Sequence, residues 1–311
     1  MTSAAGTGSA TVRVGTRGSA LALAQTRAVA ASLTAKTGAE TEIITISTEG
    51  DRSSESLASL GGTGVFASAL RDALLAGECD VVVHSLKDLP TAPVAGLTIA
   101  AIPKREDARD ALCARDGFTL DTLPDGARVG TGSPRRVAQL RARRPDLEVV
   151  DIRGNVDTRL GKVASGELDA VVLAVAGLTR LGRLDAVTDF LSIDWWPTAP
   201  GQGALAIEVR SGEEKLAKSL DHATSHIIVE AERRTLAMLE AGCSAPVAAH
   251  ALIDDGMLFL SARVYSADGT ERLTSSHALY VSDTKDPASD VAERVAKELF
   301  DLGAAGLIGA A

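Results

Sequence analysis

The segment HSLKDLP (84–90) carries four reactive side chains within five residues: His84, Ser85, Lys87 and Asp88. It follows the apolar run DVVV, which is typical of a buried strand. Enzymes of the α/β class place binding and catalytic groups where strands end. Asp88 is therefore a candidate acid–base carboxylate in a cleft. The alternative is an ordinary ion pair with the neighbouring Lys87 at a turn.

Two other segments, GTRGS (15–19) and GTGSPRR (130–136), are typical of the turn between a strand and a helix. Backbone N–H groups at a helix start attract anions, because they lack partners within the helix and lie at the positive end of its dipole. Both turns are therefore candidate anion sites. Their polar residues are Arg17 and Ser19 in the first turn, and Ser133, Arg135 and Arg136 in the second. Ser19 and Ser133 are the predicted N-caps of the two helices.

The second turn places two arginines where positive charge opposes the helix dipole by a few tenths of a kcal/mol. A bound anion would compensate for this, and a solvated basic face is the alternative. Arg153 and Arg159 follow the next predicted strand and add two guanidinium groups. Guanidinium groups bind carboxylates and phosphates. No loop of the form GxxxxGK[ST] occurs, so a substrate with several carboxylates is favoured over a phosphate.

Cys243 lies in the short segment GCSAP (242–246), between a predicted helix and a predicted strand. Cys79 and Cys113 lie in apolar runs, where a cysteine behaves as a small hydrophobe. A position just after a helix C-terminus disfavours the thiolate of Cys243, and no relay residue stands beside it. Such a thiol suits a covalent link that is made once and kept. The cysteine spacing fits no metal site, so we expect no metal.

Two similar α/β units are indicated by internal echoes. RVGTRGSALALAQ (13–25) resembles RVGTGSPRRVAQ (128–139), and GECDVVVH (77–84) resembles GELDAVVL (166–173). Alternating strands and helices predict mostly parallel sheets that are covered on both faces. We expect a ligand cleft between the two units.

The remainder of the chain predicts a small α+β unit. A helix over 226–241 precedes three strands (247–253, 257–265 and 276–282) and a helix over 288–303. The segment 200–210 returns the chain to the first unit. The predicted division is a mobile tail at 1–10, domain 1 at 11–103 and 204–221, domain 2 at 104–203, and domain 3 at 222–311.

Composition narrows the function classes. The chain has 311 residues and a formal net charge of −9, which argues against general nucleic-acid binding. The N-terminal segment has no leader pattern, and no run of about 18 apolar residues occurs. We therefore expect a cytoplasmic protein that does not enter a membrane. No apolar interface helix is evident, which favours a monomer.

Taken together, the motifs closely resemble the porphobilinogen deaminase (hydroxymethylbilane synthase) family. The matching stretches include TRGSALALAQ, GGTGVF, VVVHSLKDLPT, REDARDAL, VGTGSPRRVAQLRARRPDL, IRGNVDTRL, LDAVVLAVAGLTRLG, APGQGALAIE and EAGCSAP, in this order. HSLKDLP with RGNVDTRL and GQGA is a specific combination. The resemblance implies an α/β fold with two similar lobes like those of type II periplasmic binding proteins. It also implies a small α+β C-terminal domain that carries the cofactor cysteine.

The resemblance implies a transferase of tetrapyrrole and heme biosynthesis. Such enzymes join four porphobilinogen molecules head to tail, release ammonia, and hydrolyse off the linear tetrapyrrole hydroxymethylbilane. The family primes this reaction with a dipyrromethane cofactor, held by a thioether to a loop cysteine. By motif, that residue is Cys243. The acetate and propionate groups of each pyrrole agree with a cleft rich in arginine.

Further roles follow from the same motifs. Asp88 would be the catalytic carboxylate and would also contact the cofactor. The other implied cofactor ligands are Ser85, Lys87, Ser133, Arg135 and Arg136. The implied substrate ligands are Arg17, Ser19, Arg153, Arg159, Arg180 and Gln202.

The chain departs from the family pattern in the loop over 49–64. Glu49 stands where an arginine is frequent, and Ser59 and Thr63 replace family lysines. Two alternatives to the enzyme remain at this point. A non-catalytic anion-binding protein with two lobes would not need Cys243, and a cysteine-nucleophile transferase would need a base beside it.

Overall fold

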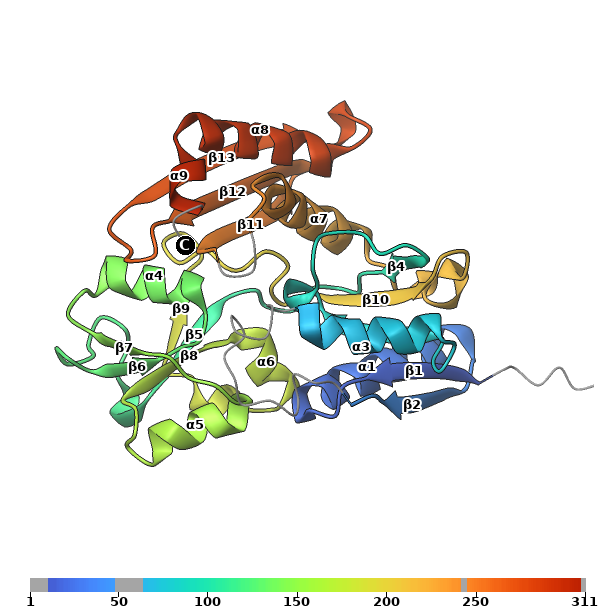
Figure 1. Cartoon of the computed structure of the whole chain (residues 1–311), viewed down its shortest axis with the longest axis horizontal. Helices are drawn as coiled ribbons and strands as arrows, with labels where there is room; N and C mark the ends of the chain where they lie inside the picture. The colour runs from blue at the N-terminus through green and yellow to red at the C-terminus, as the bar shows by residue number, and fades with distance from the viewer. Residues whose placement is uncertain (1–10, 48–63, 242–244, 309–311) are drawn as a thin grey trace, which may run out of the picture.

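The structure is a computed structural model that describes residues 11–47, 64–241 and 245–308. Its strands form three sheets. Two five-stranded sheets build neighbouring lobes, and a three-stranded sheet belongs to a third unit that lies across the top of both in Figure 1. The expected architecture of two α/β lobes with a small α+β unit is confirmed.

The first lobe has the strand order β2-β1-β3-β10-β4. Its elements are β1 (Val12–Thr16), α1 (Ala20–Thr37), β2 (Thr41–Thr45), α3 (Gly64–Leu75), β3 (Val81–Ser85), β4 (Leu97–Ala101) and β10 (Leu205–Arg210). The Ser19 hydroxyl caps α1 by accepting from the Ala22 N–H, as the sequence predicts. Val29 and Leu33 of this helix are buried in the core beneath it.

The second lobe repeats this arrangement with the order β7-β6-β8-β5-β9. Its elements are β5 (Asp110–Ala114), β6 (Arg128–Gly130), α4 (Pro134–Arg143), β7 (Glu148–Val150), α5 (Val156–Ala164), β8 (Ala170–Ala174), α6 (Val175–Arg180) and β9 (Asp189–Leu191). Pro134 starts α4, where its missing N–H has no helical partner to lose. In Figure 1 this lobe lies beside the first, with α6 on the facing side.

Each five-stranded sheet is mostly parallel, as expected, since four of its strands run in one direction and one runs against them. Strand β10 runs antiparallel to β3 and β4, and β5 runs antiparallel to β8 and β9. Each strand enters its sheet from the crossover between the lobes. Leu205 therefore pairs with Ser85, and Asp110 pairs with Ala174, at the ends of β3 and β8. A strand that starts where its neighbour ends must run antiparallel to it.

The sequence echo corresponds to a shared structural device. The Asp80 carboxylate accepts a hydrogen bond of 2.9 Å from the Arg13 N–H, and Asp169 accepts one of 2.7 Å from the Arg128 N–H. The aspartate backbone N–H groups donate in return to the Arg13 and Arg128 carbonyls. Both GE(C/L)D motifs thereby attach the start of one strand to its neighbour.

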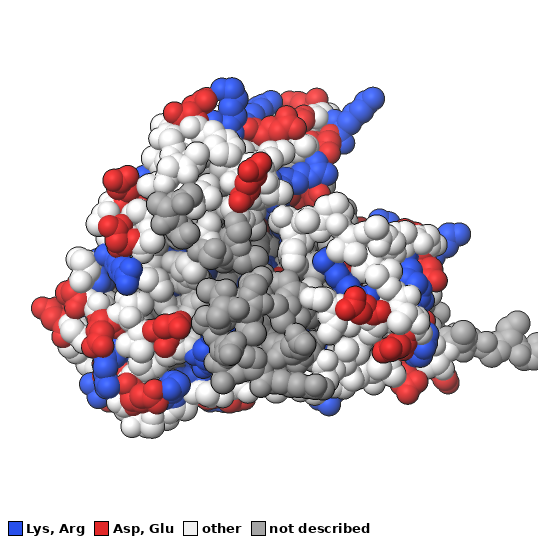
Figure 2. Space-filling view, in the orientation of Figure 1, with Lys and Arg blue, Asp and Glu red and all other residues white. Residues whose placement is uncertain are grey.

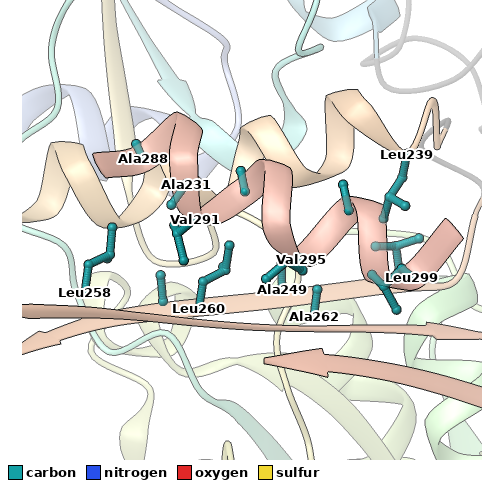
Figure 3. Close-up of a cluster of buried hydrophobic side chains, with 14 of the residues drawn as sticks. Ala231, Leu239, Ala249, Leu258, Leu260, Ala262, Ala288, Val291, Val295 and Leu299 are labelled. Carbon is teal, nitrogen blue, oxygen red and sulfur yellow. The ribbon is translucent and has the colours of Figure 1, made fainter. Parts of the chain in front are cut away.

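The third unit packs two helices on one face of an antiparallel sheet. Its elements are α7 (Ala223–Met238), β11 (Val247–Asp254), β12 (Met257–Tyr265), β13 (Arg272–Tyr280), α8 (Pro287–Asp301) and α9 (Ala304–Ile308). Figure 3 shows Val291, Val295 and Leu299 of α8 lying over Leu260 and Ala262 of β12. Strand β13 starts at Arg272, earlier than predicted, because it pairs with β12 from its first residue. Within the described ranges, no helix is long and apolar enough to cross a membrane.

Candidate functional site

The end of β3 is braced on both sides. His84 Nε2 lies 2.9 Å from Glu208 Oε2, and the Arg71 guanidinium donates to the same carboxylate. Burial raises the pKa of Glu208, but hydrogen bonds from His84 and Arg71 outweigh burial and lower it. On the opposite side, the Ser85 hydroxyl and the Gln25 amide exchange hydrogen bonds of 3.1 and 3.2 Å. These contacts hold the 3-10 turn η1 (Leu86–Asp88), which follows directly.

Turn η1 presents Lys87 and Asp88, both partly exposed. Burial lowers the pKa of Lys87 to about 8; Asp88 acts to raise it and Arg136 to lower it. Lys87 Nζ makes a long contact of 3.5 Å with Gln202 Oε1. Among the described residues, Lys87 and Asp88 form no ion pair, and the Asp88 carboxylate has no hydrogen-bond donor. The ordinary ion pair considered for this turn is therefore not seen.

The N-terminus of α4 leaves polar groups available. Ser133 occupies the N-cap position but makes no capping hydrogen bond with its side chain, contrary to the prediction. Instead, its N–H donates to Thr131 Oγ1 at 3.3 Å. Arg135 and Arg136 follow in the first turn and are only 4% and 5% exposed. The alternative of a solvated basic face is therefore wrong for these two arginines.

Asp110 binds both arginines. This fully buried carboxylate accepts hydrogen bonds from Arg135 Nη2 at 2.8 Å and Arg136 Nη2 at 2.6 Å. Trp196 Nε1 and Gln202 Nε2 also donate to it, each at 2.8 Å. Burial raises the pKa of Asp110, but the two guanidinium groups outweigh burial and hold it well below its usual range. One buried anion thus compensates two buried cations only in part.

Sequence reasoning did not single out Asp110 or Glu208. Each is an acid in an otherwise apolar strand, DALCA for Asp110 and LAIEV for Glu208. A buried carboxylate needs hydrogen-bond donors or a cation, so such an acid could have indicated a buried ion pair. Its partners could not have been named, because Arg71 lies 137 residues from Glu208.

Arg153 and Arg159 extend the cationic group. Burial, together with the nearby Arg136 and Arg153, lowers the pKa of Arg159 to about 10, although Asp151 and Asp88 act to raise it. Asp88 of the first lobe is thus close enough to influence an arginine of the second. Arg159 Nε donates to the Gly154 carbonyl at 2.9 Å. Arg153 has no ion pair with any described residue.

The other predicted site residues occupy two kinds of position. Arg17 and Ser19 lie in the β1–α1 turn, partly exposed. Gln202 is fully buried at the crossover, and its amide nitrogen also donates to the Ala108 carbonyl at 2.7 Å. Arg180 donates to the Gly203 carbonyl at 2.7 Å. Gln202 and Arg180 therefore hold the segments that connect the lobes.

The arrangement fits a ligand with several carboxylates. Arg136 and Asp88 each lie close enough to influence the charge of both Lys87 and Arg159, and Arg153 influences Arg159. The Nε atoms of Arg135 and Arg136 are buried and have no hydrogen-bond partner among the described residues. Unpartnered buried donors are costly, and an acidic ligand offers the acceptors and negative charge that this site lacks.

Cys243 and most of the loop over 49–64, including Glu49, Ser59 and Thr63, lie outside the described residues. Cys79 and Cys113 are buried, and burial raises the pKa values of their thiols to about 11 and about 12. Both thiols are therefore protonated and inert at neutral pH. The interpretation of these two cysteines as small hydrophobes is confirmed.

Comparison with protein families gives two matches. Residues 12–218 match the family model described as "Porphobilinogen deaminase, dipyromethane cofactor binding domain". Residues 226–301 match the model of the porphobilinogen deaminase C-terminal domain. Together these matches span both lobes and most of the third unit.

Several curated proteins are similar along nearly the whole chain. Porphobilinogen deaminase from Leifsonia xyli is 62% identical over 308 residues, covering 95% of this chain and 94% of that protein. The enzyme of the same name from Thermobifida fusca is 53% identical and covers 94% of each chain.

Solved structures with a similar arrangement are periplasmic binding proteins. A substrate-binding protein of an ABC transporter from Coxiella burnetii has a TM-score of 0.44 and 14% identity, covering 67% of this chain and 91% of that chain. The methionine-binding protein MetQ has a TM-score of 0.43 and 12% identity, covering 68% of this chain and 86% of that chain. These structural similarities are too weak to support any statement about function.

Proposed function

The chain belongs to the porphobilinogen deaminase family, and we propose how its own residues perform the reaction of that family. It joins four porphobilinogen molecules head to tail into hydroxymethylbilane, losing one ammonia per porphobilinogen and consuming one water at release. The observation that carries the proposal is the position of Asp88 among Lys87, Arg136, Arg153 and Arg159 of two lobes.

Asp88 acts at the reacting centre. Loss of ammonia leaves positive charge that is shared with the pyrrole nitrogen, and a carboxylate beside that N–H stabilises it. The same carboxylate assists removal of the proton that restores the aromatic ring after each new C–C bond. Asp88 suits this role because no described residue donates a hydrogen bond to it, so both oxygens remain available.

The cationic residues bind acids and orient them. The cofactor is contacted by Lys87, Ser85, Ser133, Arg135 and Arg136. The substrate or the growing chain is contacted by Arg17, Ser19, Arg153 and Arg159. Arg180 at the end of α6 and Gln202 at the crossover complete these contacts. Arg135 contributes mainly through its unpartnered Nε, because Asp110, Gln139 and Pro197 already occupy its terminal nitrogens.

The dipyrromethane cofactor fits this site, since its acidic side chains match the unpartnered donors. When bound, it supplies the carbon to which the first porphobilinogen is joined. Cys243 is its attachment residue. The buried Cys79 and Cys113 do not compete, because a thioether requires an accessible thiol and both are at most 2% exposed.

Several wider features belong to the same proposal. The domains follow the boundaries 11–103 with 204–221, 104–203 and 222–311. The protein acts in the cytoplasm as a monomer and does not bind nucleic acid. Figure 2 supports the absence of nucleic-acid binding, because positive and negative side chains are interspersed over the described surface of the face it shows. A nucleic-acid site normally shows a basic stripe.

Intact-protein mass spectrometry tests the proposal. Wild-type protein should exceed its sequence mass by one dipyrromethane, and the Cys243→Ala variant should show its bare mass. Cys79→Ala is the matched control and should retain the added mass. Cofactor that persists in Cys243→Ala would place the attachment elsewhere. Wild-type protein that stays at its bare mass after incubation with porphobilinogen would contradict the function itself.

A further inference from the structure

Helix α4 contacts the third unit through its C-terminal half. Gln139 Nε2 lies 3.4 Å from the Tyr265 hydroxyl, and Arg141 Nη1 donates to the Ala267 carbonyl at 3.0 Å. Ala138 is fully buried in a cluster with Tyr265 and Ala248. The partners of α4 therefore include the end of β12 and the turn between β12 and β13 (266–271).

Gly269 brings the backbone of this turn directly against the helix. Its φ is +78°, a conformation that favours glycine. A Cβ atom built there would lie 2.4 Å from the Ala138 carbonyl oxygen and 3.0 Å from the Ala142 nitrogen. Because both neighbouring atoms belong to the backbone, a side chain at position 269 would have to push the helix or the turn away.

The turn is internally braced. The Asp268 carboxylate accepts hydrogen bonds from the Ser266 hydroxyl at 2.6 Å, the Thr270 hydroxyl at 2.8 Å and the Thr270 N–H at 3.0 Å. The Ser266 N–H also donates to the Glu271 carbonyl at 3.0 Å. A turn with these bonds resists deformation, so displacement by a new side chain falls largely on α4.

The same contacts connect the third unit to the predicted anion site at the start of α4. Gln139, which touches Tyr265, accepts a hydrogen bond of 2.6 Å from Arg135 Nη1. Gln139 and Arg135 also donate to the Pro197 carbonyl, at 2.9 and 3.0 Å. One helical turn therefore separates the third unit from the arginines that begin α4. A shift of the helix would move Arg135, Arg136 and the Ser133 hydroxyl together.

We propose that the β12–β13 turn is a positioning element for the reaction, with Gly269 and Tyr265 as positioning residues. The turn sets the location of α4, so that the groups at its N-terminus meet the acidic side chains of cofactor and substrate. This inference rests on the proposed function of those groups. The third unit would thereby contribute to the anion site of the second lobe, in addition to carrying Cys243.

The chain offers a matched pair of variants. Gly256, in the turn between β11 and β12, has a φ of +74° and no atom within 4 Å of a built Cβ. Gly256→Ala and Gly269→Ala thus introduce a similar backbone strain, but only Gly269→Ala presses on α4. We expect the KM for porphobilinogen to rise about tenfold or more in Gly269→Ala, since small misplacements of binding groups have large kinetic effects. The kcat should change less than the KM. Gly256→Ala should resemble wild type in both constants.

Two readouts do not depend on turnover. Intact mass should show less covalently bound cofactor in Gly269→Ala than in Gly256→Ala. Hydrogen exchange of the α4 amides should be faster in Gly269→Ala alone. Equal KM, cofactor content and α4 exchange in the two variants would overturn the inference. Inactive wild-type protein would instead contradict the proposed function, and the exchange comparison would still test whether the turn holds the helix.

Tyr265→Phe provides the test if Gly269→Ala does not fold. It removes only the hydroxyl that contacts Gln139 and leaves the buried ring in place. We expect the KM to rise about threefold and the thermal midpoint to stay unchanged. A tenfold change corresponds to about 1.4 kcal/mol of binding free energy, so a threefold change corresponds to about half of that. An unchanged KM in a folded Tyr265→Phe variant would reject the role of this contact.

Discussion

At the scale of single residues, the site combines Asp88, a carboxylate with no hydrogen-bond donor among the described residues, with two cations whose pKa values are lowered, Lys87 and Arg159. The pKa of Lys87 falls to about 8 because burial disfavours its charged form. Above pH 8 the unfolded chain then binds more protons than the folded one, so the contribution of Lys87 to folding stability rises with pH up to about 10.5. Its ability to hold a carboxylate falls over the same range. At neutral pH, Lys87 therefore lowers the folding stability, while its charge is available to bind a carboxylate.

Asp88→Asn tests the carboxylate directly. The variant should fold with a thermal midpoint close to that of wild type, because no described residue donates a hydrogen bond to Asp88 and only its charge near Lys87 and Arg159 is lost. Product formation should fall by about 100-fold or more, the range of a lost acid–base group. Asp151→Asn is the matched control, since Asp151 also acts on the charge of Arg159 but is exposed. Near-normal turnover in Asp88→Asn, or an equal loss in both variants, would remove Asp88 from the chemistry.

At the scale of elements, the arginines at the start of α4 and before α5 differ in burial and therefore in function. Arg135 is 4% exposed and is held by Asp110, Gln139 and Pro197, so it belongs to the packing of the second lobe. Arg153, in the turn before α5, is partly exposed and has no ion pair with any described residue. Both arginines are predicted to bind acidic groups of the ligand. Loss of Arg135 would also remove a partner of the buried Asp110, whereas loss of Arg153 would leave no described residue without its ion-pair partner.

Neutralising the two arginines separates these functions. Arg135→Gln leaves Asp110 with one guanidinium partner fewer in a buried site, which costs about 3 kcal/mol of unfolding free energy. Arg153→Gln should leave the unfolding free energy within about 0.5 kcal/mol of wild type while raising the KM for porphobilinogen. Urea unfolding and steady-state kinetics on both variants provide the comparison. Equal stability losses, or a wild-type KM in Arg153→Gln, would contradict this division.

At the scale of the whole molecule, one buried carboxylate ties the three units together. Glu232 of α7 accepts hydrogen bonds from Arg105 Nη1 at 2.7 Å and from the Gly201 N–H at 2.7 Å. These two partners lie on the two crossovers between the lobes. The Ala251 N–H of β11 donates to the same carboxylate at 2.8 Å. The third unit is therefore anchored to both crossovers, in addition to its contacts with α4 of the second lobe.

Glu232→Gln should weaken all three units at once. Loss of the charge opposite the buried Arg105 is expected to lower the unfolding free energy by about 3 kcal/mol or more, measured by urea unfolding. Glu230→Gln, two residues away on the same helix, is the matched control. Glu230 is half-exposed and pairs with Arg234, so its loss should cost under about 1 kcal/mol. Similar losses in the two variants would show that Glu232 is not the anchor.

The sequence alone determined the local features of this protein. Strand and helix patterns, the cap at Ser19 and the polar residues that follow strands depend on neighbours a few residues away. The echo between 13–25 and 128–139 correctly indicated two lobes. Pattern did not give every detail, however. Ser133 does not cap α4 with its side chain, and the one strand of each lobe that returns from a crossover runs against its neighbours.

The tertiary structure alone decided which polar groups meet. Asp110 and Gln202 are 92 residues apart, and Arg105 and Glu232 are 127 apart. No periodicity or motif connects such partners, since a buried charge can be compensated from any element that packs nearby. The contact of Gly269 with α4 belongs to the same class: the sequence shows a turn glycine, and only the fold shows the helix against it.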